Sequence, residues 1–291
     1  MAPSPVILAD PPIPPEPIGL IAAGGRLPVL VAEGMRQAGH PVYAIGLSGQ
    51  YEPSICDLCD RFGEVGAMRL GSWGKRLSRM GVRHAVMVGK VDKAKLMHSW
   101  RTIIRNRPDT TSLGLWVKLR RDRRSHIILN AIAERLAADG VQLIDSTTHI
   151  SDHLAEVGCM TRREPTLGQR ADIDLGWPIL LQLLGLDVGQ AIAVRERDVI
   201  AVEAVEGTDR MIERCDELMP APGWTLLKGA RAGHDRRSDV PVIGPDTIHT
   251  MHRCGGRCVA VAAGDVIILD KPETLRIADE LGIAVVGMPQ A

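Results

Sequence analysis

The densest group of side chains that could do chemistry lies in a polar stretch of the C-terminal third of the chain. Asp235 and Asp239 are two carboxylates four residues apart. The cations around them are Lys228, Arg236 and Arg237. Carboxylate oxygens suit Mg²⁺, and Lys and Arg neutralise phosphate oxygens as charge develops. The pattern indicates a site for a phosphorylated substrate, in which metal-ligand, acid–base and nucleophile roles for the Asp pair stay open, although a solvated loop of ion pairs would have the same composition.

A second polar group lies at Glu206, Thr208 and Asp209, where a predicted strand gives way to a predicted helix. Strand ends and helix N-termini are where α/β proteins place ligands. The alternative is that Thr208 only caps the helix and that Asp209 only interacts favourably with its dipole.

A third feature is the glycine turn Gly24-Gly25-Arg26, which follows the apolar run 18–23. A glycine turn that opens a helix exposes backbone N–H groups to an anion. Neither a Walker loop nor GxGxxG is present. We expect a phosphate-binding turn here, with a plain strand-to-helix turn as the alternative.

The six cysteines include two close pairs, Cys56 with Cys59 and Cys254 with Cys258. Together these pairs could supply four thiolates to a zinc ion. We favour a set of reduced core thiols in a cytosolic protein, because the ligand pairs of natural zinc sites lie closer in sequence.

Composition excludes several classes of protein. The 291 residues carry a formal net charge of zero, which excludes a strongly basic nucleic-acid binder. Only 3% of residues are aromatic, so a base-stacking platform is excluded as well. No apolar run approaches the roughly 20 residues of a membrane span, and the Pro-rich start lacks the basic region of a secretory signal.

Charge is concentrated between residues 75 and 126, where fifteen Lys and Arg residues face three Asp residues. Such a block attracts phosphates or anionic lipid headgroups. Trp100 and Trp116 lie within it, as at a membrane interface. A solvated basic face with two core tryptophans is the alternative.

Strand and helix patterns alternate along the chain and predict an α/β protein. We expect a Pro-rich arm (1–17), a Rossmann-like domain with a parallel sheet (18–150), a linker region with one or two helices (151–190) and a second, mixed α/β catalytic domain (191–291). Predicted strands of the first domain cover 18–23, 42–47, 85–88 and 141–144. Those of the second cover 191–194, 199–205, 225–228, 259–262, 266–269 and 283–286. Predicted helices cover 28–38, 72–80, 127–138, 208–218, 246–254 and 272–281, with Ser72, Thr208 and Asp246 as caps.

Four segments resemble the bacterial UDP-2,3-diacylglucosamine pyrophosphatases of the LpxI type. They are Gly19-Leu-Ile-Ala-Ala-Gly-Gly-Arg-Leu-Pro28, Leu186-Asp-Val-Gly-Gln190, Ala201-Val-Glu-Ala-Val-Glu-Gly-Thr-Asp209 and Asp235-Arg-Arg-Ser-Asp-Val-Pro-Val-Ile-Gly-Pro-Asp-Thr247. The resemblance covers nearly the whole chain after the arm, and the last two motifs are the specific ones.

The resemblance implies a hydrolase of lipid A biosynthesis that depends on Mg²⁺, with Mn²⁺ as the alternative ion. It would cleave UDP-2,3-diacylglucosamine to UMP and 2,3-diacylglucosamine 1-phosphate. It implies a homodimer, a location in the cytoplasm at the surface of the inner membrane, and no nucleic-acid partner. Asp239 would be the key catalytic residue and Asp235 the second choice. The implied metal ligands are Asp239, Asp235, Glu206 and Asp209. The implied substrate ligands are Gly24, Gly25, Arg26, Gln190, Thr208, Lys228, Arg236 and Arg237.

Two other functions remain open on sequence grounds. A non-catalytic nucleotide-sugar or lipid-phosphate binding protein would share the basic block but would not need the paired carboxylates Asp235 and Asp239. A nicotinamide-dependent oxidoreductase is disfavoured because GxGxxG is missing and because no acidic ribose partner follows the strand 42–47.

Overall fold

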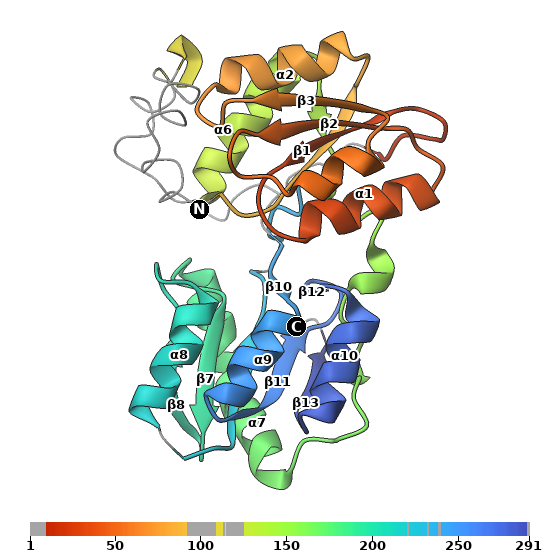
Figure 1. Ribbon diagram of the computed structural model, residues 1–291. Helices are drawn as coiled ribbons and strands as arrows, with labels where there is room; N and C mark the ends of the chain where they lie inside the picture. The colour runs from red at the N-terminus through yellow and green to blue at the C-terminus, as the bar shows by residue number, and fades with distance from the viewer. Residues whose placement is uncertain are drawn as a thin grey trace. The chain divides into compact units, whose positions relative to one another are not determined.

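The computed structural model describes residues 10–91, 109–112, 114, 125–219, 221–231, 233–237 and 240–289. It divides into two compact units, which are drawn in Figure 1. The first comprises the described residues of Met1–Ser151 together with those of Asp235–Asp239. The second comprises those of Asp152–His234 and Val240–Ala291. The chain therefore leaves the second unit after His234, contributes a short segment to the first, and returns.

The first unit is built on a five-stranded parallel sheet with the order β3-β2-β1-β4-β5. Its strands are β1 (Ile18–Ala22), β2 (Val42–Leu47), β3 (Arg61–Val65), β4 (His84–Val88) and β5 (Gln142–Leu143). β1 is buried along its whole length, as expected for a central parallel strand covered on both faces. The strand order reverses beside β1, and at such a point doubly wound sheets bind ligands beyond the carboxyl ends of their strands. The predicted Rossmann-like parallel sheet is confirmed.

Helices cover both faces of this sheet. They are α1 (Leu27–Gln37), α2 (Leu70–Arg79) and α6 (Ser125–Ala138), with a short 3-10 helix η1 (Pro53–Leu58). Trp73 and Leu77 of α2 and Leu136 of α6 form one core with Ile21 and Ile45 of the sheet. Figure 1 shows α1 on the opposite side of the strands.

The second unit contains a six-stranded mixed sheet with the order β6-β13-β11-β9-β7-β8. Its strands are β6 (Gly158–Cys159), β7 (Ala191–Arg195), β8 (Asp198–Val202), β9 (Trp224–Lys228), β11 (Gly256–Ala262) and β13 (Ala284–Met288). β9, β11 and β13 are parallel, and the hairpin β7–β8 is antiparallel, as predicted. A separate parallel pair joins β10 (Val242–Ile243) to β12 (Ile267–Ile268). The second unit is therefore mixed α/β, which confirms the predicted fold class.

Helices also cover both faces of the second sheet. They are α7 (Leu167–Gly185), α8 (Thr208–Leu218), α9 (Pro245–Arg253) and α10 (Lys271–Glu280). α8, α9 and α10 share a core that includes Met211, Met251, Ile277 and Trp224. α7 packs on β7 and β9 and contributes to a second core, and Figure 1 draws it behind the strands, with α8, α9 and α10 in front. The region 151–190 thus carries a short 3-10 helix η2 (Ser151–His153), β6 and α7.

Three predicted helix caps are wrong. α2 begins at Leu70, so Ser72 lies inside it, where its hydroxyl donates to the Arg69 carbonyl at 2.7 Å. Gly207 precedes the first residue of α8 in place of Thr208, and Gly244 precedes α9 in place of Asp246. Gly207 has a φ of 83°, a conformation that glycine adopts without the steric cost of a side chain.

In the part of the chain that the structure describes, no helix is long and apolar enough to cross a bilayer. Trp100, Trp116 and most cations of the block 75–126 lie outside the described residues, as do Asp239 and the arm up to residue 9.

Candidate functional site

One edge of the second sheet gathers several of the expected substrate ligands. β8 and β9 both run antiparallel to β7, which lies between them, so their carboxyl ends meet at the edge where β7 begins. Lys228 ends β9 there, and Gln190 immediately precedes β7. The Gly229 N–H donates to the Gln190 carbonyl at 3.0 Å, and the Glu203 N–H donates to the Ala191 carbonyl at 2.9 Å. These backbone hydrogen bonds hold the carboxyl ends of β8 and β9 next to the start of β7.

A chain of side-chain hydrogen bonds crosses this edge. The Lys228 ammonium donates to Oγ1 of Thr208 at 2.7 Å, and the Thr208 hydroxyl donates to Oε2 of Glu203 at 3.1 Å. Lys228 and Glu203 are only 6% and 8% exposed. A buried ammonium is costly unless it is hydrogen-bonded and has an opposite charge nearby, and this cluster supplies both. The expected ligands Thr208 and Lys228 are therefore together, and Thr208 bonds to Glu203 rather than capping its helix.

Of the two candidate metal ligands of this unit, Asp209 lies at the start of a helix as predicted, whereas Glu206 does not end a strand. β8 ends at Val202, so Glu206 lies in the turn before α8 and does not end a strand. Oε1 of Glu206 pairs with the guanidinium of Arg214 at 3.0 Å. Asp209 is exposed in the first turn of α8, where a carboxylate interacts favourably with the helix dipole.

In the first unit, the glycine turn lies beside the end of β4. Gly24 and Lys90 exchange two backbone hydrogen bonds, each of 2.9 Å, so the Gly24 N–H is already occupied. Gly25 has a φ of 90°, and a Cβ atom added to it would meet nothing within 4 Å, which leaves open space at the turn. Arg26 directly precedes α1, and its guanidinium pairs with Glu33 at 3.2 Å. The turn follows β1, beside which the strand order reverses, and Gly25 is its open residue.

The segment 235–237 is attached to the first unit through Arg236. The Arg236 carbonyl accepts hydrogen bonds from the Ser146 N–H at 2.9 Å and from the Ser146 hydroxyl at 2.7 Å. Its guanidinium pairs with Asp145 at 2.9 Å and donates to Oγ1 of Thr147 at 2.7 Å. Asp145 also accepts from the N–H and hydroxyl of Thr147 at 2.8 and 2.7 Å. Arg236 thus fastens the segment that leads towards Asp239.

Asp235 and Arg237 contact each other within the same segment. Nε and Nη2 of Arg237 donate to Oδ1 and Oδ2 of Asp235 at 2.8 and 2.6 Å, and Nη2 also donates to Oδ1 of Asn130 on α6 at 2.7 Å. Asp235 is only 8% exposed. Its carboxylate is therefore paired with a guanidinium within the first unit.

The described residues do not by themselves assemble a metal site. Among them, no group of three or more His, Cys, Asp or Glu side chains could hold a metal ion. Asp235 pairs with Arg237 and Glu206 pairs with Arg214, and these two acids lie in different units. Asp239, the other expected ligand, is outside the described residues.

The cysteine pairs are free thiols in different units, with Cys56 and Cys59 in the first and Cys254 and Cys258 in the second. Burial raises the pKa of Cys59 and of Cys258 to about 12. Without a metal, thiols with such pKa values are protonated at neutral pH and are poor nucleophiles. Among the described residues, which include all four of these cysteines, no group of three or more His, Cys, Asp or Glu side chains could hold a metal ion. The described residues thus favour reduced thiols over a zinc site.

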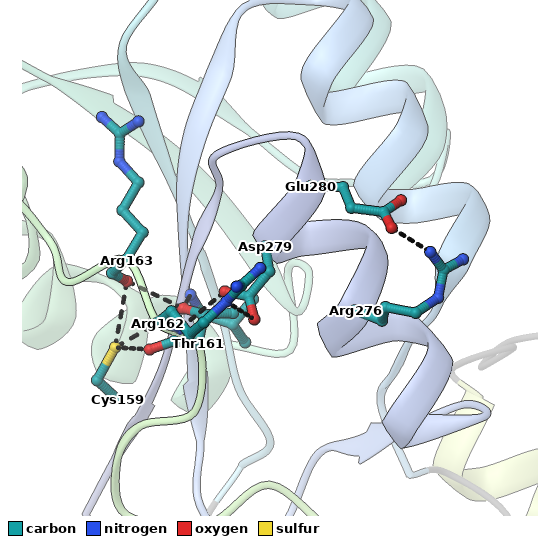
Figure 2. Close-up of polar contacts among 8 residues, drawn as sticks. Cys159, Thr161, Arg162, Arg163, Arg276, Asp279 and Glu280 are labelled. Atoms are coloured by element: carbon teal, nitrogen blue, oxygen red, sulfur yellow. Dashed lines mark hydrogen bonds and ion pairs between the residues drawn. The ribbon is translucent and has the colours of Figure 1, made fainter.

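A further polar cluster lies in the second unit where the chain enters α7 (Figure 2). The Thr161 hydroxyl donates to the Arg163 carbonyl at 3.0 Å and accepts from the Val285 N–H at 2.9 Å. Arg162 binds Asp279 of α10 through its backbone N–H at 2.7 Å and through Nε at 3.1 Å. These bonds fasten the loop to β13 and α10, so we assign the cluster a structural role.

Comparison with known proteins covers both units. Residues 17–153 match the family model of the LpxI N-terminal domain, and residues 156–286 match that of the LpxI C-terminal domain. The chain belongs to the LpxI family. It is 28% identical over 285 residues to the UDP-2,3-diacylglucosamine pyrophosphatase LpxI of Caulobacter vibrioides, covering 93% of this chain and 97% of that protein. The expected family is confirmed, and with it membership of a family of hydrolases.

Two acidic residues of the candidate site in this LpxI-family chain were not expected from the sequence. Glu203 stands inside the run Ala201-Val-Glu-Ala-Val205, which resembles a plain strand. An acidic residue within an apolar strand is the signal that could have identified it, because such a group is buried only with partners. Asp145 follows a predicted strand, as ligand-bearing residues in parallel sheets do.

Proposed function

We propose that this chain hydrolyses the pyrophosphate of UDP-2,3-diacylglucosamine to UMP and 2,3-diacylglucosamine 1-phosphate, a step in lipid A biosynthesis. The observation that carries the proposal is the family match along both units, together with a relative of that activity aligned over nearly its whole length. Water adds across the anhydride, one P–O bond breaks, and each product keeps one phosphate.

Each unit, taken by itself, carries residues that suit a phosphate-containing substrate. Phosphoryl transfer depends mainly on positioning and on neutralising the phosphate oxygens. The buried ammonium of Lys228, aligned by Thr208, supplies a positive charge at a sheet edge in the second unit. Gly25 offers an open turn at the strand-order reversal of the first unit, where we place a phosphate of the nucleotide. Asp239 would activate or orient the attacking water.

We also propose that the reaction requires Mg²⁺ or Mn²⁺. Such an ion neutralises paired phosphates and polarises the phosphorus. The described carboxylates Asp235 and Glu206 are paired with arginines, so they fit an ion only after giving up those partners. UMP release with and without chelator therefore tests the requirement for a divalent cation.

The proposed substrate carries two acyl chains, so we propose that the protein works in the cytoplasm at the surface of the inner membrane. We propose separately that it is a homodimer. The basic block 75–126 supports attraction to anionic headgroups. Flotation with vesicles of anionic and of neutral lipid tests the first part, and light scattering of the purified chain tests the second.

The reaction itself is tested by incubating the purified full chain with UDP-2,3-diacylglucosamine and Mg²⁺, with and without chelator, and by measuring UMP. We expect UMP that disappears with chelator and returns with added Mg²⁺ or Mn²⁺. Substrate binding by folded protein without UMP would contradict the proposal and favour a binding protein.

Asp239→Ala is expected to lower kcat about 100-fold or more, since removing a group that activates water costs on the order of 10²–10⁴ in rate. The matched control is Asp216→Ala, which removes an exposed carboxylate on α8. Normal turnover by folded Asp239→Ala would exclude the assigned role.

A further inference from the structure

We propose that Glu203 is a positioning residue that holds the Lys228 ammonium in place through the Thr208 hydroxyl. The inference rests on the proposed function, and it names a residue that neither the sequence motifs nor the family match assigns. In this proposal the Glu203 carboxylate acts through Thr208 and Lys228 and not by binding the substrate itself.

The direction of the hydrogen bonds defines the role of each group. The Lys228 ammonium can only donate, so the Thr208 oxygen accepts that bond at 2.7 Å. The single hydroxyl proton of Thr208 is then directed to Oε2 of Glu203 at 3.1 Å. Without the carboxylate acceptor, this proton has no fixed direction, and the hydroxyl can rotate away from the ammonium. Glu203 therefore determines which way Thr208 presents its lone pair to Lys228.

The backbone holds Glu203 firmly in this position. Its N–H donates to the Ala191 carbonyl at 2.9 Å. A Cβ atom at Gly189 would lie 2.1 Å from the Glu203 carbonyl oxygen, so the two segments approach each other as only glycine permits. A carboxylate held by a rigid backbone is what a preorganised site requires of its supporting groups.

Burial and charge explain why an acid is needed here. Lys228 is 6% exposed, and an ammonium so deeply buried needs a nearby negative charge. Glu203, 8% exposed, supplies this charge one hydroxyl away rather than in direct contact. The relay through the Thr208 hydroxyl fixes the position of the ammonium for a phosphate whose charge develops during the reaction.

The test is a kinetic series on the full chain with UDP-2,3-diacylglucosamine, after the wild type has been shown to release UMP. Glu203→Ala is expected to lower kcat about 100-fold with KM changed less than about threefold, because a misplacement of about 1 Å costs rate of that order. Glu203→Gln keeps an oxygen that accepts the Thr208 proton, so we expect a smaller loss, about tenfold. Glu217→Gln, an exposed acid on α8, is the matched control and should match the wild type.

A double-mutant cycle separates positioning from simple stability. Thr208→Val removes the relay, so adding Glu203→Ala to it should lower kcat by less than about threefold more. Thermal unfolding of each variant must lie above the assay temperature, and kcat is expressed per folded molecule. If Glu203→Ala does not fold, the cycle is run with Glu203→Gln.

The outcomes are distinct. Wild-type protein without UMP release would contradict the proposed function. Wild-type UMP release with unchanged kcat in Glu203→Ala and Glu203→Gln would overturn the positioning role alone. Multiplicative losses for Glu203 and Thr208 variants would also overturn it, because they would show that the two residues act independently.

Discussion

Asp145 is expected to hold the segment 235–237 on the first unit, and Asp145→Ala tests this attachment. Its Oδ2 pairs with Arg236 at 2.9 Å, with side chains 24% and 26% exposed. A pair exposed to this extent is screened by solvent and contributes about 0.5–1 kcal/mol. Oδ1 accepts two hydrogen bonds from Thr147, each worth about 1 kcal/mol. Asp145→Ala should therefore lower the free energy of unfolding by about 2–3 kcal/mol.

The assay is urea unfolding of the full chain in a double-mutant cycle with Arg236→Ala. We expect a coupling free energy of about 0.5–1 kcal/mol between the two sites. The control cycle uses Glu164→Ala and Arg170→Ala, an ion pair whose side chains are 70% and 54% exposed. It should give a coupling close to zero.

The same variants decide how Arg236 serves turnover. If the Arg236 guanidinium acts by helping to hold the segment, the losses of kcat in Asp145→Ala and Arg236→Ala should not multiply, because either change removes the same ion pair. If its guanidinium contacts a phosphate directly, the two losses should multiply. A coupling free energy indistinguishable from that of the control cycle would refute the contribution of this ion pair to the attachment.

Two further predictions concern stability. Lys271 is 9% exposed and donates to backbone carbonyls in the segment 152–156 at 3.0 and 2.8 Å, so Lys271→Met should lower the free energy of unfolding by about 2–4 kcal/mol in a urea titration. Glu156→Gln changes only the exposed partner of Lys271, so it should lower the free energy of unfolding much less than Lys271→Met does; equal losses would contradict this. Burial, and then the neighbouring His40, lowers the pKa of His149. The unfolded chain then takes up the proton first as pH falls, so the first unit should lose stability as pH drops below about 6.5. The urea midpoint of His149→Gln should fall less than that of the wild type between pH 7 and pH 5, and equal falls would exclude His149 as the cause.

Most of the fold could be predicted because apolar runs and glycine stops are local signals. β1, β2 and β4 are continuous apolar runs, and the hairpin β7–β8 has a polar tip. β3 was missed because Arg61-Phe-Gly-Glu-Val65 is neither apolar nor strictly alternating. It forms a strand because its five residues pair in parallel with residues of β2.

The sequence predicted residue types of the candidate site but not the contacts among them. Thr208 and Lys228 were each expected as substrate ligands, in separate groups, and the structure brings the two together at one edge of the second sheet. Glu203 was missed although it lies only five residues from Thr208, because its run resembles a plain strand. The contact of Asp145 with Arg236 could not be assigned, because the two residues are distant in sequence. Local pattern gives the residue types that a site needs, whereas long-range pairing decides which of them meet.

The path of the chain between the units has a consequence for protein engineering. The two family models meet between residues 153 and 156, yet residues 235–237 belong to the first unit. An N-terminal fragment cut at that junction would leave the turn at Ser146 without the carbonyl that accepts its two hydrogen bonds. In chimeras built from two relatives, residues 235–237 should therefore come from the parent that supplies the N-terminal half, and not from the parent of their sequence neighbours.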